Sequence, residues 1–303
     1  MSKFQRFADE DEERAGADNT SNMLSIKDPS PDYSREIRNE KIDDKFRRSP
    51  IKTWLKMLFP HFELLSFSTL YALILAIVFV LQVLVWFTSR WTCVIYHMGA
   101  CYTPAIHRWQ IHRLVFPTLL HYDFPHLAWN IFVLAAVGMN AEHYLGTVGY
   151  ICLIAVSALL GNMFTAGFRF GICNQSVGAS VVMMGIIAFE FIWFAFNWKK
   201  MKIAKWLYIL YLFMIFLTTM MGTWGSGYIY ETWGLIGGFL AGACITCIFF
   251  TELQNVDFVQ KFKFGFILAL GVLFLISFIA MLMRDTRFCY PNLCNHRYYE
   301  YFN

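Results

Sequence analysis

The chain has 303 residues, of which 57% are apolar and only 15% are charged. Soluble globular domains average about a quarter charged residues, and here 22 of the 46 charged side chains lie within residues 1–50. This composition excludes a soluble enzyme, a disulfide-rich secreted module and a nucleic-acid-binding protein. It leaves a polytopic membrane protein behind a polar amino-terminal segment.

The polar segment, residues 1–56, is expected to be a disordered cytoplasmic tail, because it is highly charged and poor in apolar side chains. Its acidic run Asp9–Glu13 is the opposite of an Arg-rich, acid-poor mitochondrial signal. We therefore expect a membrane of the secretory pathway or the plasma membrane, and not a mitochondrial one.

Seven stretches of the remaining chain are long and apolar enough to cross a membrane. A bilayer core of about 30 Å needs roughly 20 mostly apolar residues in a helix, and backbone groups must pair internally within hydrocarbon. The predicted fold class is therefore an all-α membrane protein with seven transmembrane helices. The expected spans lie near residues 64–89, 114–141, 143–168, 178–198, 206–230, 232–251 and 264–283.

The basic residues of the short loops predict the orientation of these helices. Lys199, Lys200, Lys202 and Lys205 lie between the fourth and fifth spans, whereas the loop between the fifth and sixth has no base. With seven spans, this bias places the amino terminus in the cytoplasm. The short carboxyl-terminal tail, residues 284–303, then lies on the lumenal or extracellular side.

Five of the eight cysteines fall on this expected outer side, where an oxidising environment favours one or two disulfides. The simplest pair is Cys289 with Cys294, and an odd number leaves at least one cysteine outside any intramolecular bond. We expect no metal and no other cofactor, since the pair Cys244 and Cys247 lies within lipid and has no matching partner. The five outer cysteines are Cys93, Cys101, Cys173, Cys289 and Cys294.

Polar groups inside a membrane are costly, so the residues that interrupt the apolar pattern are informative. His126 and Asn130 of the second span lie four apart on one helical face. Two such donors can stabilise a developing negative oxygen, and interhelical hydrogen bonding is the alternative. In the fourth span, Gly178 two residues before Ser180 favours a hydroxyl exposed at a helix start, with an ordinary helix contact as the alternative.

Two further features concern the packing of the spans. Gly234, Gly238 and Gly242 lie four apart in the sixth span, which indicates close approach of another helix. Glu190 is a lone acid in the fourth span. We expect its side chain to reach the cytoplasmic interface near Lys199, and binding to a polar group on a partner span is the alternative.

Together these segments resemble the rhomboid family of intramembrane serine proteases, over roughly residues 64–283. The resemblance also includes Arg113 ahead of the second span and the sequence from Glu142 to Gly146 at its end. Seven spans with the additional one at the carboxyl end resemble the 6+1 arrangement of eukaryotic rhomboids.

The resemblance implies a role for each polar position. Ser180 corresponds to the nucleophile, and His126 and Asn130 correspond to the oxyanion hole. The general base of the family is a His just before the glycines of the sixth span, and Leu235 occupies that position here. Val181 also replaces the usual Gly after the nucleophile, and its branched side chain should crowd the contact with the sixth span.

A serine hydroxyl needs an adjacent base to become a good nucleophile, and losing that His costs on the order of 10⁶ in turnover in the best-studied soluble case. We therefore interpret the chain as a rhomboid pseudoprotease. It is expected to bind transmembrane segments of client membrane proteins within the lipid bilayer, and to affect their trafficking or degradation without cleavage. The rival interpretation is an active rhomboid protease in which Ser180 uses an unusual base or a water. A transporter or channel has little support, because no inverted repeat is evident.

Overall fold

The structure is a computed structural model, and it describes residues 63–87, 90–169, 173–199, 205–225, 232–250, 257–289 and 294. These residues belong to the larger of two compact units, Leu55–Asn303. The tail expected at residues 1–56 lies outside the described residues, as do Lys200 and Lys202. Within the described ranges the chain is almost entirely helical, with one isolated antiparallel bridge between Cys101 and Ser176. The predicted all-α membrane fold is confirmed.

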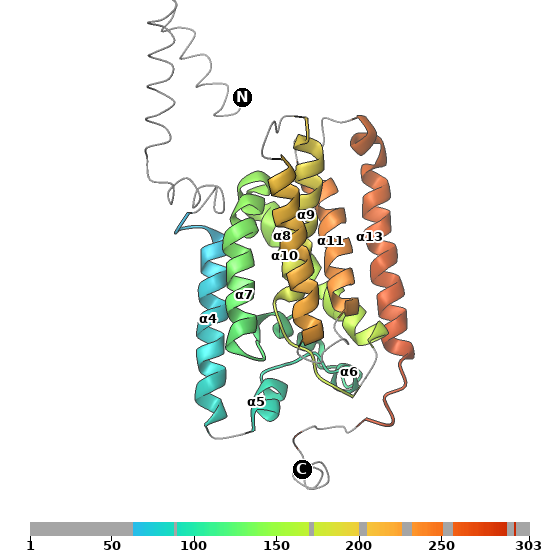
Figure 1. Cartoon of the computed structure of the whole chain (residues 1–303). Coiled ribbons are helices and arrows are strands. Elements are labelled where there is room, and N and C mark those ends of the chain that lie inside the picture. Colours follow the sequence, from blue (N-terminus) through green and yellow to red (C-terminus); the bar gives the residue numbers. More distant parts are fainter. Residues whose placement is uncertain are drawn as a thin grey trace, which may run out of the picture. The chain divides into compact units, whose positions relative to one another are not determined.

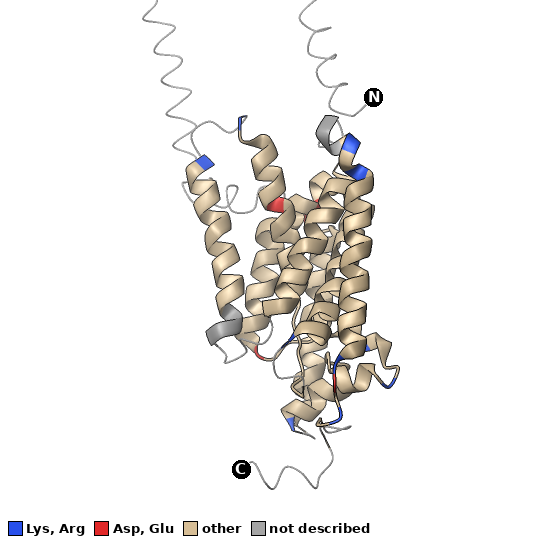
Figure 2. Cartoon of the chain, turned by 90° about the vertical axis from the view of Figure 1, so that its right-hand side faces the viewer, with Lys and Arg blue, Asp and Glu red and all other residues tan. Residues whose placement is uncertain are grey.

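Long apolar helices run side by side through this unit (Figure 1). Lys, Arg, Asp and Glu gather near the helix ends, and the helix bodies are almost free of them (Figure 2). Such a distribution suits a hydrocarbon environment along the middle of the helices. The main elements are α4 (Phe67–Trp86), α7 (Phe124–Val133), the π-helical turn η3 (Leu134–Gly138), α8 (Met139–Phe168), α9 (Ser180–Asn197), α10 (Lys205–Gly225), α11 (Thr232–Phe249) and α13 (Asp257–Met283).

Five helical stretches of the described residues are long and apolar enough to span a membrane. One of them, Phe124–Phe168, has 45 residues and is interrupted at Gly146, whose φ of +70° favours glycine. Counting its two arms separately, and adding the apolar helix α10, gives seven apolar helical segments within the described ranges. The seven crossings and their orientation remain predictions.

The segment between α4 and α7 is a cap of short helices rather than part of a span. The second span was expected near residues 114–141, but its helix begins only at Phe124. It begins there because the Asp123 side chain accepts a hydrogen bond from the His126 N–H at 2.8 Å and Pro125 occupies the first turn. The cap contains α5 (Trp91–His97), α6 (Thr103–Ile106), η1 (Ile111–Leu114) and η2 (Phe116–Leu119).

Glu142 of α8 fastens the first turn of α4. Its carboxylate accepts hydrogen bonds from the N–H groups of Phe67 at 2.8 Å and Ser68 at 2.9 Å, and from the Ser68 hydroxyl at 2.8 Å. Ser68 Oγ also lies 3.0 Å from the hydroxyl oxygen of Tyr150. The first N–H groups of a helix lack intrahelical partners and favour a negative charge. This carboxylate therefore holds α4 against α8.

Helix α11 meets its neighbours backbone to backbone. A Cβ added to Gly238 would collide with the carbonyl oxygen of Val181, and one added to Gly242 with the carbonyl oxygen of Gly185. One added to Gly234 would collide with a side-chain hydroxyl on α8. All three glycines of the sequence stripe therefore lie where α8 or α9 leaves no room for a side chain.

The Val181 side chain does not push these helices apart. A Cβ on Gly161 of α8 would lie 2.9 Å from Val181 Cβ, and one on Gly234 would lie 3.2 Å from Val181 Cγ1. The branched side chain therefore fills the space left by two glycines. The crowding expected from Val181 is relieved by the absence of side chains at Gly161 and Gly234.

We predict that Gly238→Ala destabilises the fold, because its methyl group would meet rigid backbone. The free energy of unfolding should fall by about 3 kcal/mol, the upper end of overpacking effects. The matched control is Gly271→Ala in α13, where nothing lies within 4 Å of the added Cβ; helix propensity should leave its stability unchanged or raise it by up to about 1 kcal/mol. Thermal unfolding in detergent micelles measures both, and equal melting temperatures would contradict the packing.

A second prediction concerns the Glu142 contact. Glu142→Gln keeps the shape of the side chain but removes its charge and turns an amide donor toward N–H groups, so stability should fall by about 2 kcal/mol. Glu63→Gln is the control, since Glu63 is exposed. The same unfolding measurement applies. A Glu142→Gln protein as stable as the Glu63→Gln protein would show that the carboxylate contributes nothing.

Candidate functional site

Ser180 is the first residue of α9 and is 95% buried, with 5% of its surface exposed. The chain reaches it through Gly178, whose φ of +138° lies in a region that side chains rarely tolerate. The Gly178 N–H donates to the Pro117 carbonyl oxygen at 2.9 Å, and Ser176 pairs with Cys101 in the bridge. The loop before Ser180 is thus tied to the cap.

His126 and Ser180 lie against the same glycine. A Cβ added to Gly178 would lie 2.6 Å from His126 Cε1, 2.9 Å from its Nε2 and 3.3 Å from Ser180 Oγ. The absence of a side chain at Gly178 is therefore what allows the imidazole ring to approach the start of α9. The structure brings together these three of the predicted site residues.

Asn130 lies one helical turn further along α7 and is completely buried. Its Nδ2 atom is 3.0 Å from Nε2 of His121, and its Oδ1 atom is buried without a hydrogen-bond partner. This unpaired oxygen could accept a hydrogen bond from a donor group only. Asn130 is thus held at its amide nitrogen, and its amide oxygen is unpaired.

His121 was not among the residues selected from the sequence. It lies in the segment before α7, is fully buried, and its ring centroid is 5.2 Å from that of His126. Burial, with a smaller contribution from His126, lowers the pKa of His121 to about 3. The ring is therefore neutral at pH 7. The sequence signal was the grouping of His121, Asp123 and His126 around the start of an apolar helix.

Leu235 of α11 occupies the position predicted for the missing base. Its side chain is fully buried and belongs to the same apolar cluster as Ala179 and Val181. Helix α11 carries no His, Asp, Glu or Lys between Thr232 and Phe249. The face of α11 that packs against the start of α9 therefore offers hydrocarbon and backbone, and no proton acceptor of the usual kind.

The prediction that Glu190 reaches the cytoplasmic interface is wrong. Glu190 is fully buried, and its carboxylate accepts hydrogen bonds from Asn140 Nδ2 at 2.8 Å and from the Tyr208 hydroxyl at 2.6 Å. The alternative, binding to polar groups on partner spans, is the observed one. Two donors on α8 and α10 compensate for burial of the acid, so Glu190 links three helices.

The suggested disulfide between Cys289 and Cys294 is also wrong. The structure pairs Cys93 with Cys294 and Cys173 with Cys289, because the segment after α13 lies beside the cap and the loop before Ser180. Cys101 stays outside both bonds, with its Sγ 3.8 Å from the Asn162 carbonyl oxygen. Among the described residues, no three His, Cys, Asp or Glu side chains are grouped to hold a metal ion.

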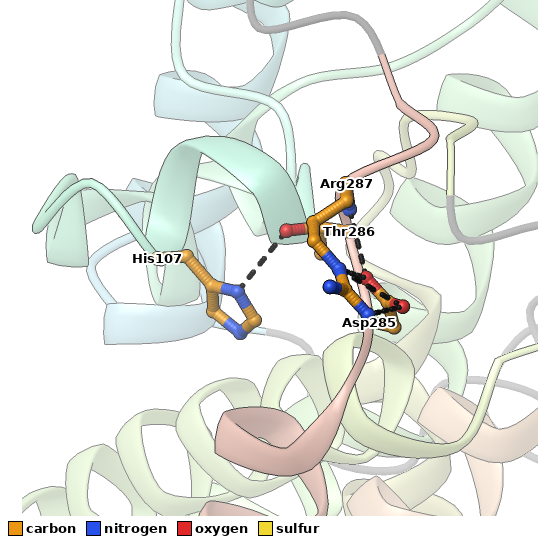
Figure 3. A network of polar contacts seen from close by, with 4 residues as sticks. All are labelled: His107, Asp285, Thr286 and Arg287. Atoms are coloured by element: carbon orange, nitrogen blue, oxygen red, sulfur yellow. Dashed lines mark hydrogen bonds and ion pairs between the residues drawn. The ribbon is translucent and has the colours of Figure 1, made fainter.

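The end of α13 is also held to the cap by His107 of the α6 segment. His107 Nε2 lies 2.7 Å from the Met281 carbonyl oxygen, and its Nδ1 lies 3.3 Å from Thr286 Oγ1. Figure 3 shows the ring pointing toward Thr286, with Asp285 and Arg287 paired beside it. With Nε2 as donor and Nδ1 as acceptor, both contacts are satisfied by one neutral tautomer.

The fold and this site define a helical membrane protein with a buried serine and an imidazole at one end of its helices. Residues 108–252 match the family model described as Rhomboid domain. The chain is 30% identical to Rhomboid-like protease 1 of Toxoplasma gondii over 224 residues, which cover 69% of this chain and 72% of that protein. It is 29% identical over 165 residues to Rhomboid-like protease 3 of the same organism, covering 52% of this chain and 59% of that protein. The chain belongs to the rhomboid family.

The disulfide pairing gives a third prediction. Cys173→Ser should leave Cys289 as a reactive thiol, while Cys93 and Cys294 stay bonded. Maleimide labelling under non-reducing conditions, followed by peptide mapping, reads out each thiol. Cys152→Ser, outside both bonds, is the control and should release no new thiol. Labelling of Cys294 in the Cys173→Ser protein would contradict the pairing.

Proposed function

We propose that this protein is a rhomboid pseudoprotease, which binds transmembrane segments of client membrane proteins and alters their trafficking or degradation without cutting them. The observation that carries the proposal is Leu235, a fully buried aliphatic side chain at the position of the family's general base. Client binding is proposed by analogy with inactive rhomboids and derlins, since fold alone does not determine function.

Catalysis by Ser180 would depend on a group that accepts the proton of its hydroxyl. Attack on a peptide carbonyl requires that proton to pass to a base within hydrogen-bond reach. Leu235 cannot accept it, and α11 brings no other acceptor side chain to the contact with α9. Loss of the base costs on the order of 10⁶ in turnover in the best-studied case. The scaffold and its donors are kept while the proton acceptor is missing.

A second candidate function is intramembrane proteolysis with Ser180 as nucleophile. The specific support is the position of His126, whose ring lies against Gly178 beside the Ser180 hydroxyl. The names of both relatives also describe them as proteases. In this alternative, His126 or a water would have to accept the proton.

We further propose that the amino terminus is cytoplasmic and that the protein resides in the secretory pathway or the plasma membrane. Disulfides persist in oxidising compartments. Both bonds, Cys93–Cys294 and Cys173–Cys289, involve the segment that follows α13. Their presence at that end supports a lumenal or extracellular carboxyl terminus.

Cleavage of a transmembrane substrate in proteoliposomes tests the catalytic part of the proposal. Wild type, Ser180→Ala and Leu235→His are compared. We expect wild type and Ser180→Ala to give the same background, because neither has a working serine–base pair. Cleavage by the Leu235→His protein would show that the other site residues still have a geometry that supports catalysis. Cleavage by wild type that is lost in Ser180→Ala would establish the protease instead, and His126→Ala would then test the base.

Capture of the same transmembrane segment tests the binding part. Photo-crosslinking in proteoliposomes should give equal capture by wild type and Ser180→Ala. Gly178→Ala should reduce capture, because its methyl group would displace the His126 ring. Gly265→Ala is the control, since nothing lies within 4 Å of its added Cβ. Equal capture by all four proteins, or capture by none, would contradict binding at this site.

A further inference from the structure

Gln82 is a fully buried polar residue in α4. Its Nε2 donates to the carbonyl oxygen of His121 at 3.0 Å, and the N–H of His121 donates to Gln82 Oε1 at 3.1 Å. A buried amide in a membrane helix is costly unless its groups are paired. Here both ends of the amide are paired with the main chain of one residue, so α4 fixes the backbone of His121 at two points.

The side chain of His121 continues this contact toward the site. Its Nε2 lies 3.0 Å from Asn130 Nδ2, and Gln82, His121 and Asn130 are each fully buried. The contacts thus run from the Gln82 side chain to the main chain of His121, and from the His121 ring to Asn130, which links α4 to α7. The remaining amide atom of Asn130 is buried and has no partner.

The two ends of a side-chain amide differ in function. With its NH2 group free, Asn130 can donate a hydrogen bond to a carbonyl oxygen, whereas with its oxygen free it repels one. A neutral imidazole has one N–H and one acceptor nitrogen, so the tautomer of His121 determines which end of Asn130 it binds and which end remains free. A ring that could rotate or change tautomer would leave both orientations populated.

We propose that Gln82 and His121 are positioning residues that fix the orientation of the Asn130 amide on α7, whose His126 lies against Gly178 beside Ser180. In the structure the Asn130 nitrogen is bound to His121 and its oxygen is free. The inference deepens the proposed function and rests on it only in assigning this free oxygen to a hydrogen-bond donor, such as a main-chain N–H, of a bound client. The fixed orientation itself is a property of the protein without any client.

Nitrogen-15 spectra of the full-length protein in detergent micelles test this positioning directly. Histidine labelling reports the tautomer of each ring, and the His121 signal is identified by its loss in His121→Phe. Asparagine labelling reports the side-chain amides, and the Asn130 signal is identified by its loss in Asn130→Asp. We expect one His121 tautomer, neutral from pH 8 to pH 5, and one sharp Asn130 amide signal.

Gln82→Leu should free the His121 main chain, because it removes both hydrogen bonds from α4. The expected change is a second His121 tautomer and a split or broadened Asn130 signal. Capture of a transmembrane segment should weaken by about tenfold, the size expected when one hydrogen bond is lost. Thr246→Val is the matched control, since Thr246 is equally buried and its hydroxyl donates only to the Gly242 carbonyl oxygen of its own helix. A general loss of packing would change the Asn130 signal and capture in both variants. Loss of positioning would change them only in Gln82→Leu.

Two results would overturn the proposal. One is a wild-type His121 that exchanges between tautomers or titrates near its ordinary pKa of about 6.5. The other is an Asn130 signal that Gln82→Leu leaves unchanged. Both spectra are recorded without client. If the spectra are as expected but client capture fails, the result counts against the proposed function and not against the positioning of Asn130.

Discussion

The backbone contact between α9 and α11 is the constraint on which the site depends. At Gly238 and Gly242, the two helices approach so closely that a methyl group would collide with carbonyl oxygens of α9. Interhelical attraction in lipid comes from such close packing, because hydrocarbon supplies no hydrophobic driving force between helices. The approach fixes the start of α9, and therefore Ser180, against whatever side chain α11 presents. At this contact α11 presents Leu235, which packs in one apolar cluster with Ala179 and Val181, the neighbours of Ser180.

The contact also explains how two unusual residues are tolerated together. Val181 adds a branched side chain where α9 meets α11, and Gly161 on α8 leaves the volume that it needs. Leu235 is fully buried in the same apolar cluster. An imidazole in that place would be a polar group within a hydrocarbon cluster and would need a partner. The surroundings of Leu235 are therefore those of a packed core position.

The sequence predicts most of the fold because a membrane imposes a simple pattern. Apolar length determines each helix, and the glycine stripe indicates the close contact of the sixth span. The sequence does not predict which distant groups meet. Glu190 finds its donors on α8 and α10, and Cys289 finds Cys173 rather than Cys294. Such pairings depend on the three-dimensional arrangement of helices, which spacing along one chain does not encode.

His121 illustrates the same limit within the site. From the sequence, His126 stands out because it lies four residues before Asn130, whereas His121 has no such spacing to a polar residue of the helix. Its importance arises from Gln82, 39 residues earlier, which binds its main chain at both polar groups. The side-chain amide of Gln82 thus joins the first apolar segment to the start of the second. In a hydropathy profile the same residue only lowers the apolar character of its helix. A buried polar residue in a membrane helix is costly unless a partner compensates it. The partner of Gln82 is His121, and the ring of His121 contacts Asn130 directly.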